Sequence, residues 1–330
     1  LLQKLSVLIL LHEDELTEME ARDVGKPLRQ ARMDVKACAR YFEFYGGAAD
    51  KVHGETIPYL DGYTVLTFRE PHGVTGHVIP WNYPLQIIGR TVGGALTMGN
   101  ACVLKPGEEA SQTALMVGEL ATQAGFPPGV FNIVTGLGEE AGDVLINHSG
   151  VHHLSFTGST EVGALVQQAA AKNAVPVTLE LGGKSPQVVF SDADLDKALP
   201  FLVNASIQNC GQTCSAASRV LVEQSIYENL TLRLAEEFTL LQAGPAFRDL
   251  NCGPLISPEQ QVRLEKYLEQ AKADGLNFVA EGEIVYDAPS GGNYVKPMLI
   301  RDVPPDHVVA QVELFGPVLA VMSFQDEDEA

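Results

Sequence analysis

Hydrophobic residues recur at helical spacing over the first part of the chain. Apolar positions fall every three or four residues from Leu28 to Ala39, so residues 1–49 are predicted to be helical. The segment from Gly62 to Arg69 instead alternates apolar and polar residues and contains threonine and tyrosine. Such alternation is typical of an exposed strand or of one side of a hairpin arm.

From residue 74 to residue 181, short apolar runs alternate with segments of helical period. The predicted strands cover 74–80, 101–105, 130–134, 153–156 and 175–181, and the predicted helices cover 84–98, 111–124, 139–147 and 161–171. Strands that alternate with helices of this length form βαβ units, whose strands lie in a parallel sheet. We therefore expect a Rossmann-like nucleotide-binding layer in this half of the chain.

A second series of strands and helices follows. The strands are expected at 187–190, 217–222, 294–303 and 319–324, and the helices at 195–208, 225–241 and 258–273. The length of 330 residues corresponds to about two domains. The pattern predicts an α/β protein with a Rossmann-like parallel-sheet domain over 1–182, which carries a protruding β arm at 55–71, and a second α/β domain over 183–330.

Charge and cysteine content narrow the classes of partner. The formal charge of −20 argues against nucleic acid and anionic membranes, which require basic surfaces. No apolar run approaches the ~18 residues that span a bilayer. The five cysteines lack the spacing of metal ligands, and their odd number favours reduced thiols in a cytoplasmic protein over a disulfide framework. No metal site is predicted.

One cysteine lies in a setting that favours chemistry. Cys214 belongs to the sequence Gly-Gln-Thr-Cys-Ser, which follows a predicted helix and precedes a predicted strand. A free cysteine is more often a small buried hydrophobic residue than a nucleophile, and this is the interpretation we give to the neighbouring thiol of Cys210. For Cys214 the glycine-bracketed turn favours the nucleophile, because a thiol there can attack a carbonyl carbon.

A carboxylate precedes that cysteine on another glycine-bracketed turn. Glu180 begins the sequence Glu-Leu-Gly-Gly-Lys-Ser-Pro and ends an apolar run that starts at Val175. An exposed surface carboxylate is the simpler interpretation, but the apolar flanks predict a buried strand. Partial burial raises the pKa of a carboxyl group towards neutrality, which suits a general base. Together, a thiol and a base indicate covalent capture of a carbonyl and its release by water.

Four further turns border the predicted strands. They are Pro80-Trp81-Asn82-Tyr83-Pro84, Val103-Leu104-Lys105-Pro106-Gly107-Glu108, Phe156-Thr157-Gly158-Ser159-Thr160-Glu161-Val162-Gly163 and Glu313-Leu314-Phe315-Gly316-Pro317-Val318. The first three follow strands, where open α/β sheets bind their ligands. Each turn is a weak signal alone: Asn82 is also a residue type that caps helices, and the third turn has the spacing Gly-x₄-Gly rather than the Gly-x-Gly-x-x-Gly fingerprint.

Taken together and in this order, the motifs resemble those of the aldehyde dehydrogenase superfamily, from about Gly25 to the end of the chain. The resemblance implies a non-acylating enzyme that oxidises an aldehyde to a carboxylic acid with NAD. It identifies Cys214 as the nucleophile that forms a thiohemiacetal and then a thioester. It makes the Asn82 amide, with the backbone N–H of Cys214, the oxyanion donor. Glu180 becomes the base that activates water for hydrolysis of the thioester.

The resemblance also implies a set of cofactor contacts. Lys105 and Glu108 match the pair that holds the adenosine ribose, and Glu108 would repel a 2′-phosphate, which favours NAD over NADP. Glu313 matches the residue that binds the nicotinamide ribose, and Phe315 the ring beside the nicotinamide. The remaining cofactor positions lie on the turns after the first and fourth strands: Pro80, Trp81, Gly158, Ser159 and Gly163.

Substrate residues are expected on the first helix of the sheet domain and beside the nucleophile. Tyr83 and Arg90 are seven residues apart, so they would share a face of a helix that includes both. Arg90 is interpreted either as a selector of aldehydes with a distal carboxylate or polar tail, or as a surface or interface residue. Thr213 and Ser215 flank Cys214 and are assigned to the substrate side.

The resemblance has consequences for the ends of the chain and for assembly. Relatives have more residues ahead of the first position here and a further C-terminal segment, so the catalytic domain is expected to be incomplete. Relatives form dimers or tetramers, which implies a homodimer or homotetramer for the full-length protein. Two alternatives stay open: a CoA-acylating dehydrogenase, which Glu180 disfavours, and an inactive fragment or interaction protein on the same scaffold.

Overall fold

The computed structural model describes all 330 residues and divides into two compact units. The first contains Leu1–Asp23 and Arg32–Leu181, and the second contains Val24–Ala31 and Gly182–Ala330. The chain therefore passes between the units three times. Each unit is an α/β structure, which confirms the predicted fold class.

The short segment Val24–Ala31 belongs to the second unit, whereas the sequence pattern gives no reason to separate it from its neighbours. Its hydrogen bonds explain the assignment. The backbone N–H of Arg29 donates to Asp249 Oδ1 at 2.8 Å, and the N–H of Asn209 donates to the side-chain oxygen of Gln30 at 2.7 Å. These contacts join residues that are far apart in sequence, which periodicity along the chain does not reveal.

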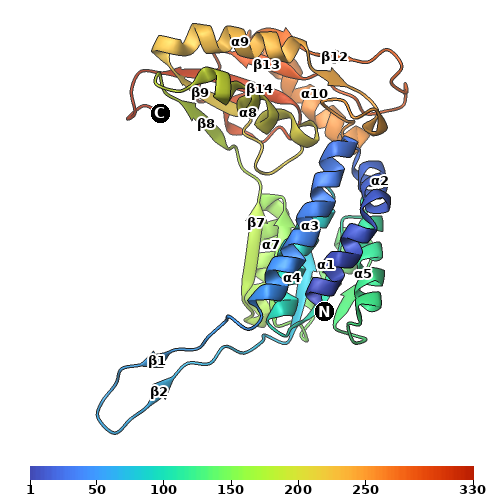
Figure 1. Cartoon of the computed structure of the whole chain (residues 1–330). Coiled ribbons are helices and arrows are strands. Elements are labelled where there is room, and N and C mark those ends of the chain that lie inside the picture. The colour runs from blue at the N-terminus through green and yellow to red at the C-terminus, as the bar shows by residue number, and fades with distance from the viewer. The chain divides into compact units, whose positions relative to one another are not determined.

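Three helices and a hairpin precede the first sheet. They are α1 (Leu2–Leu11), α2 (Glu13–Val24), α3 (Leu28–Ala48) and the two short strands β1 (Thr56–Ile57) and β2 (Val65–Leu66). The two strands pair antiparallel and form the predicted arm, which extends away from the rest of its unit (Figure 1). None of the helices in the chain combines the length and the apolar character needed to cross a bilayer.

The first sheet has five parallel strands in the order β5-β4-β3-β6-β7. Its elements follow one another as β3 (Val74–Val78), α4 (Pro84–Thr97), β4 (Ala101–Lys105), α5 (Gln112–Ala124), β5 (Phe131–Ile133), α6 (Asp143–Asn147), β6 (His153–Gly158), α7 (Thr160–Asn173) and β7 (Val177–Leu181). The chain starts at the central strand, builds outwards to β5 and then returns to the other side of β3 with β6. This order is that of a doubly wound nucleotide-binding sheet, as predicted.

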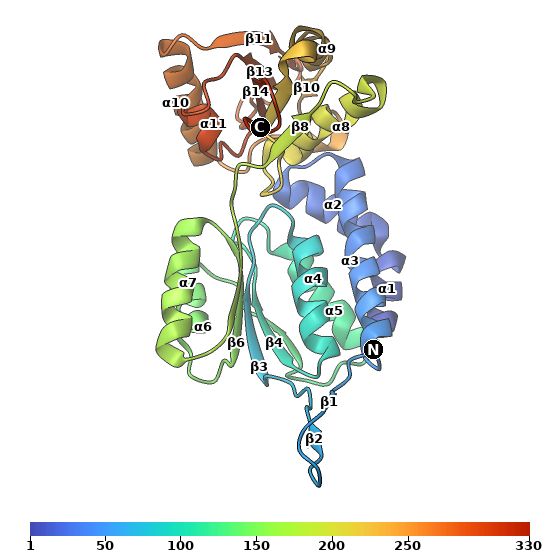
Figure 2. The same ribbon diagram turned by 90° about the vertical axis from the view of Figure 1, so that its left-hand side faces the viewer.

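Helices cover the two faces of this sheet differently. Figure 2 shows α6 and α7 on one face, and α4 and α5 on the other, with α1 and α3 outside them. Two apolar cores correspond to these layers. One joins α6 and α7 to β6 and includes Leu154 and Phe156, whereas the larger one joins α1, α3, α4 and α5 to β4 and includes Phe42 and Leu104.

The second unit also has a five-stranded sheet, in the order β11-β13-β14-β9-β8. Its elements are β8 (Pro186–Val189), α8 (Leu195–Ile207), β9 (Arg219–Glu223), α9 (Tyr227–Thr239), α10 (Pro258–Ala273), β11 (Asn277–Glu281), β13 (Met298–Arg301), α11 (Val308–Gln311) and β14 (Val318–Phe324). The strands are parallel except β11, which pairs antiparallel with β13. Figure 2 shows α8 and α9 on one side of the sheet and α10 and α11 on the other.

Two strand assignments from the sequence need correction here. The edge strand β11 was not predicted, because five residues after a long charged helix carry too little alternation to be recognised. The strand expected at 294–303 is reduced to Met298–Arg301. The antiparallel partner β11 and the parallel partner β14 both pair within that short stretch, so inter-strand pairing sets its limits.

A buried histidine makes the first unit sensitive to acid. His77 on β3 is 2% exposed, its Nε2 lies 2.9 Å from Thr75 Oγ1, and its Nδ1 has no partner. Burial, with a smaller contribution from the charge of His153, lowers the pKa of His77 to about 4. The folded state therefore binds fewer protons than the unfolded state between pH 6.5 and 4, and stability falls as the pH falls through that window.

We predict that His77→Gln removes most of this pH dependence. The wild-type protein should lose about 3 kcal/mol of unfolding free energy between pH 6.5 and 4 through this residue, because each pKa unit corresponds to about 1.4 kcal/mol. Urea unfolding at several pH values measures the effect, with the exposed His53→Gln as the matched control. Equal acid lability in the wild type and in His77→Gln would contradict the assignment.

Candidate active site

In the first unit, the candidate residues gather at the carboxyl edge of the parallel sheet. The strand order reverses between β3 and β6, and open α/β sheets bind ligands outside the strand ends at that point. Pro80, Trp81 and Asn82 follow β3, and Ser159 follows β6. The fold therefore brings two of the predicted turns to the place where a ligand of this sheet would lie.

The turn after β3 is packed closely against the turn after β4. Gly107 makes this approach feasible, since a Cβ atom there would lie 2.9 Å from the backbone nitrogen of Trp81. Asn82 is 5% exposed, and α4 begins at Pro84 with Tyr83 as its N-cap residue. Capping of the helix by the Asn82 side chain is thus not observed. Tyr83 lies at the boundary of the helix rather than within it, and Ile87 N donates to its carbonyl at 3.0 Å.

A buried lysine and a carboxylate form an ion pair at the end of β4. Lys105 is 2% exposed, and its Nζ donates to Glu108 Oε2 at 2.6 Å. Burial alone would raise the pKa of Glu108, but the ammonium of Lys105 and backbone N–H groups lower it overall. The pair presents an ionised carboxylate and a fixed ammonium, which suit the two hydroxyl groups of a ribose.

The turn after β6 leads into the amino end of α7. Ser159 is the N-cap residue, and its Oγ accepts a hydrogen bond from Val162 N at 3.3 Å. Gly163 allows the helix to lie close to β7, because a Cβ atom there would meet the side chain of Leu181. The backbone N–H groups of such a helix end favour an anionic ligand.

The position of Glu180 differs from the expectation. It lies on β7, which is an edge strand, and its side chain is exposed rather than partly buried. The apolar residues on which the prediction rested alternate with exposed residues along β7, so only the face of the strand that carries the apolar side chains is partly buried. Glu180 pairs in register with Thr157 of β6, so it remains at the same carboxyl edge as the turn that contains Ser159.

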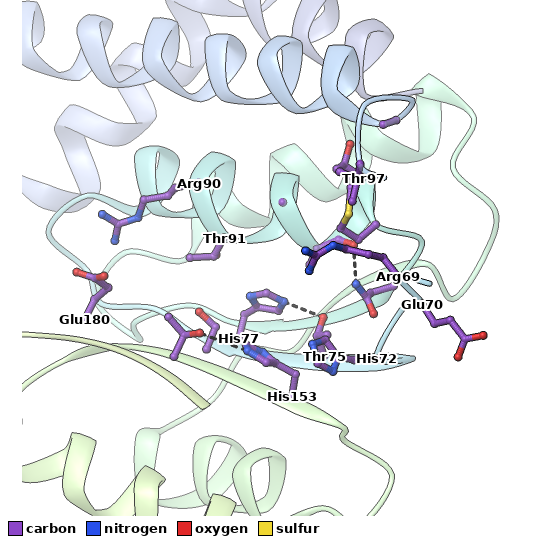
Figure 3. A pocket seen from close by; sticks show the side chains of 18 residues that line it. Arg69, Glu70, His72, Thr75, His77, Arg90, Thr91, Thr97, His153 and Glu180 are labelled. Atoms are coloured by element: carbon purple, nitrogen blue, oxygen red, sulfur yellow. Dashed lines mark hydrogen bonds between the residues drawn. The ribbon is translucent and has the colours of Figure 1, made fainter. Parts of the chain in front are cut away.

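Arg90 and Glu180 line one hollow of the first unit. The hollow has a volume of about 720 Å³ and lies between α4 and the strands β3, β6 and β7. Figure 3 shows Arg90 extending from α4, while Glu180 and the histidines His77 and His153 come from the sheet. The side chain of Arg90 is half-buried. A ligand in this hollow would meet both a guanidinium and a carboxylate.

In the second unit, the candidate residues gather at the amino-terminal edge of the parallel strands, not at the carboxyl edge as in the first unit. Cys214 precedes β9, Glu313 precedes β14, and Lys184 precedes β8. These three strands are parallel neighbours in the sheet, so their amino ends lie along one edge. Topology therefore brings together residues that are up to 129 positions apart, here 313 minus 184.

Cys214 is the only cysteine with an exposed side chain. The other four are buried, and burial raises the pKa of the Cys102 thiol to about 11 and that of Cys38 further still. The Cys210 thiol also has a pKa well above its usual value, because it contacts Cys252 and is fully desolvated. Exposure thus separates Cys214 from Cys210, the rival thiol of the sequence.

The loop before Cys214 has an unusual backbone. Asn209, Cys210 and Gly211 have φ values of +49°, +57° and +72°, which form a compact left-handed turn. A side chain at Gly211 would clash with the carbonyl of Gly316, so this loop lies directly against the turn that contains Phe315. The turn therefore holds the nucleophile candidate beside a cofactor-site candidate.

Hydrogen bonds fix the loop from within. The Gln212 side chain donates to the carbonyl of Asn209 at 3.1 Å and accepts from Ile256 N at 2.9 Å. Thr213 is buried and its Oγ1 lies 3.3 Å from Ser215 Oγ, whereas Ser215 is exposed beside Cys214. Only the thiol and Ser215 of this stretch face outwards, as a nucleophile and a neighbouring contact would.

The turn from Glu313 to Phe315 is held by residues that the sequence did not single out. Arg263 donates to the carbonyl of Glu313 at 2.8 Å, and Gln260 donates to that of Phe315 at 2.8 Å. Both residues lie on α10, where polar side chains look like ordinary surface positions, so no local signal identifies them. Phe315 has a φ of +56°, which this support stabilises. No group of three or more metal-ligating side chains is present in either unit.

The model of the aldehyde dehydrogenase family matches residues 1–330. The chain is 39% identical over 331 residues to an aldehyde dehydrogenase-like protein of Bacillus subtilis, DhaS, covering 100% of this chain and 66% of the relative. It is 40% identical to a hydroxyisobutyraldehyde dehydrogenase of Mycolicibacterium austroafricanum, covering 100% and 65%.

Solved structures give the same result. A crystal structure of a Burkholderia cenocepacia protein assigned to the aldehyde dehydrogenases superposes with a TM-score of 0.99 at 61% identity, covering 99% of this chain and 69% of that one. An NAD⁺ complex of an aldehyde dehydrogenase from Bacillus cereus superposes with a TM-score of 0.95 at 39% identity, covering 99% and 67%. The chain spans about two thirds of the length of the curated relatives it matches, 66% and 65% for the two above.

Proposed function

Because the chain belongs to the aldehyde dehydrogenase family, we propose that it oxidises an aldehyde to a carboxylic acid with NAD as the hydride acceptor. The observation that carries the proposal is the exposure of Cys214 alone among five cysteines, on a loop whose Gly211 lies against Gly316, the residue after Phe315. The balanced reaction converts one aldehyde, one NAD⁺ and one water into one carboxylic acid, one NADH and one proton.

Cys214 performs the covalent step in this proposal. Its thiolate adds to the aldehyde carbon, forms a carbon–sulfur bond and moves the carbonyl π electrons onto oxygen. The Asn82 amide and the backbone N–H of Cys214 donate hydrogen bonds to that oxyanion, a contribution worth roughly 10²–10³ in rate per donor. When bound, NAD accepts the hydride that leaves the same carbon, and the enzyme-bound product is a thioester on Cys214.

Glu180 completes the cycle. Its carboxylate removes a proton from a water molecule that attacks the thioester carbon, and the carbon–sulfur bond breaks to release the acid and the thiolate. The exposed position of Glu180 at the edge of the sheet supports contact with water. A CoA-acylating enzyme would pass the acyl group to a thiol and would not need this base.

The proposed cofactor contacts lie on the turns described above. Lys105 and Glu108 hold the adenosine ribose, and Gly158, Ser159 and Gly163 form the anion-binding helix end. Pro80 and Trp81 support the same edge, and Glu313 and Phe315 take the nicotinamide side. The ionised Glu108 favours the 2′-hydroxyl of NAD over the 2′-phosphate of NADP.

The proposal is tested by following NADH absorbance at saturating NAD with short, long, aromatic and carboxylated aldehydes. NADH formed in step with the acid would support the dehydrogenase. If product formation required CoA and gave an acyl-CoA, the protein would instead be a CoA-acylating dehydrogenase. NAD binding without NADH from any aldehyde would favour the inactive scaffold.

For the substrate, we propose that Arg90 selects aldehydes that carry a distal carboxylate. Arginine binds carboxylates through two parallel hydrogen bonds, and Arg90 lines the same hollow as Glu180. We predict that Arg90→Met lowers kcat/KM for 4-carboxybenzaldehyde about 10–100-fold relative to benzaldehyde, because a charged hydrogen bond is worth about 1.5–3 kcal/mol.

The ratio between the two aldehydes is the measured quantity, since a general loss of fold or of NAD binding affects both equally. Arg90→Lys is the matched control that keeps the charge and should retain part of the preference. An unchanged ratio in Arg90→Met would assign the residue to a surface or interface role.

The arm provides a surface for self-association in the full-length protein. Its exposed apolar and aromatic side chains are Ile57, Tyr59, Leu60, Tyr63, Leu66 and Phe68. A two-stranded hairpin that buries no core is marginally stable alone, and both strand edges remain available for pairing. We propose that this arm contributes to a homodimer or homotetramer.

A further inference from the structure

One cluster of charged side chains in the second unit is not used by the chemistry above. Lys184, Arg219 and Glu313 each have a buried polar atom without a hydrogen-bond partner: Nζ, Nε and Oε1 respectively. Buried polar atoms are normally satisfied, so several unsatisfied atoms in one region require an explanation. The sheet brings them together, because β8 and β14 flank β9 and Arg219 is in register with both Pro186 and Ala320.

The Glu313 carboxylate is held on one side only. Its Oε2 lies against Gly182, where a Cβ atom would clash with it, and the N–H of Gly183 donates to the carboxylate. Arg263 fixes the Glu313 carbonyl at 2.8 Å. The second oxygen, Oε1, is therefore left free by a rigid backbone, and it is free to accept a hydrogen bond from a ligand.

Lys184 provides a positive charge near the Glu313 carboxylate. It follows directly on Gly182 and Gly183, so its ammonium reaches the region of Glu313 from the same turn. Burial and the charge of Arg219 lower the pKa of Lys184 to about 8, while Glu313 acts in the opposite direction. Burial raises the pKa of Glu313, and the Gly183 N–H, Arg263 and Lys184 oppose that rise.

We propose that Lys184 is a positioning residue for Glu313: its ammonium keeps the carboxylate charged and leaves Oε1 directed at a hydroxyl group of the bound nicotinamide cofactor. The inference rests on the proposed function for the identity of the ligand. A buried cation that lacks hydrogen bonds is costly to keep, and here its charge opposes the rise that burial causes in the pKa of the Glu313 carboxyl, which favours the charged form that accepts a hydrogen bond from a hydroxyl most strongly.

The expected result is a loss of cofactor affinity without a loss of turnover. Lys184→Met should raise the Kd and the KM for NAD about tenfold, the size expected for one charge-assisted hydrogen bond, and leave kcat at saturating NAD unchanged. Lys184→Arg should restore part of the affinity. Isothermal titration calorimetry with NAD gives the Kd, and steady-state kinetics give KM and kcat.

The pH profile separates this role from simple packing. Lys184 loses its proton as the pH rises through about 8, so wild-type affinity for NAD should fall above that pH. The Lys184→Met variant should show no such decrease. The exposed Lys197→Met serves as control and should follow the wild type, because Lys197 pairs only with Asp194 at the surface.

A double-mutant cycle tests the electrostatic coupling of Lys184 to Glu313 without any cofactor. If Lys184 acts through Glu313, the changes in unfolding free energy caused by Lys184→Met and Glu313→Gln will not add, as interacting neighbours do not. Additive changes in urea unfolding would overturn the proposal, even if the protein proved to be no dehydrogenase. A wild type that binds NAD but makes no NADH would instead refute the proposed function and leave the affinity readout valid. Equal NAD affinity in the wild type and Lys184→Met would also overturn the proposal.

Discussion

Replacing Cys214 by alanine is expected to reduce NADH formation at least about 1000-fold, because the step that captures the aldehyde has no other exposed thiol. NAD binding should persist, since none of the proposed cofactor contacts involves the Cys214 side chain. Initial rates with the best aldehyde of the panel measure the first effect, and calorimetry with NAD measures the second.

The matched control is Cys210→Ala. This thiol lies four residues earlier, is 1% exposed and belongs to the apolar core of the second unit. Its removal should cost stability, as truncation of buried side chains does, but most of the activity per folded molecule should remain. If the two variants lost activity equally, Cys214 would have no special role and the loss would reflect the shared loop.

Glu180→Gln should produce a different kinetic pattern. If the carboxylate acts only on water, one equivalent of NADH should form rapidly per active site, and steady turnover should then fall by about 10²–10⁴ because the thioester is hydrolysed slowly. Stopped-flow absorbance resolves the two phases, and acid-quenched protein analysed by mass spectrometry should carry the acyl group on Cys214.

The exposed Glu119→Gln, on a helix far from the carboxyl edge in sequence and position, is the control and should behave like the wild type. A rapid phase reduced as much as steady turnover would show that Glu180 acts before hydrolysis. Full recovery of turnover with added CoA would point to the acylating reaction instead.

Regular periodicity made most of the fold predictable. The strands around Leu104 and Phe156 and their helices have apolar faces that only one arrangement covers, and right-handed βαβ connections leave few ways to order them. Features that depend on pairing between distant parts of the chain were harder to predict from the sequence. The strand at Asn277–Glu281 exists because β13 offers it a partner, and the segment Val24–Ala31 joins the second unit through residues far along the chain.

In the candidate site too, local motifs could be recognised from the sequence, whereas properties set by tertiary packing could not. The motifs containing Cys214, Glu313 and Ser159 were predicted to lie at the ends of strands, and the structure has them there; Cys214 and Ser159 are exposed, whereas Glu313 is partly buried. The sequence suggested burial of Glu180 from its apolar neighbours, but an edge strand covers only one side of such a run. Lys184 was visible only as part of a motif, because an unsatisfied buried ammonium is a property of three strands together.

The segment Val24–Ala31 also affects how the protein is made. Its contacts connect Gln30 to Asn209 and Arg29 to Asp249, across 179 and 220 residues. A ribosome that adds about 5–20 residues per second needs roughly 10–40 s to reach those partners. During that interval the segment has emerged without the residues that satisfy its hydrogen bonds, so the second unit can be completed only after Asn209 and Asp249 have been synthesised. A fragment that starts at Gly182 would lack this segment altogether, and adding residues 24–31 as a separate peptide should improve its folding.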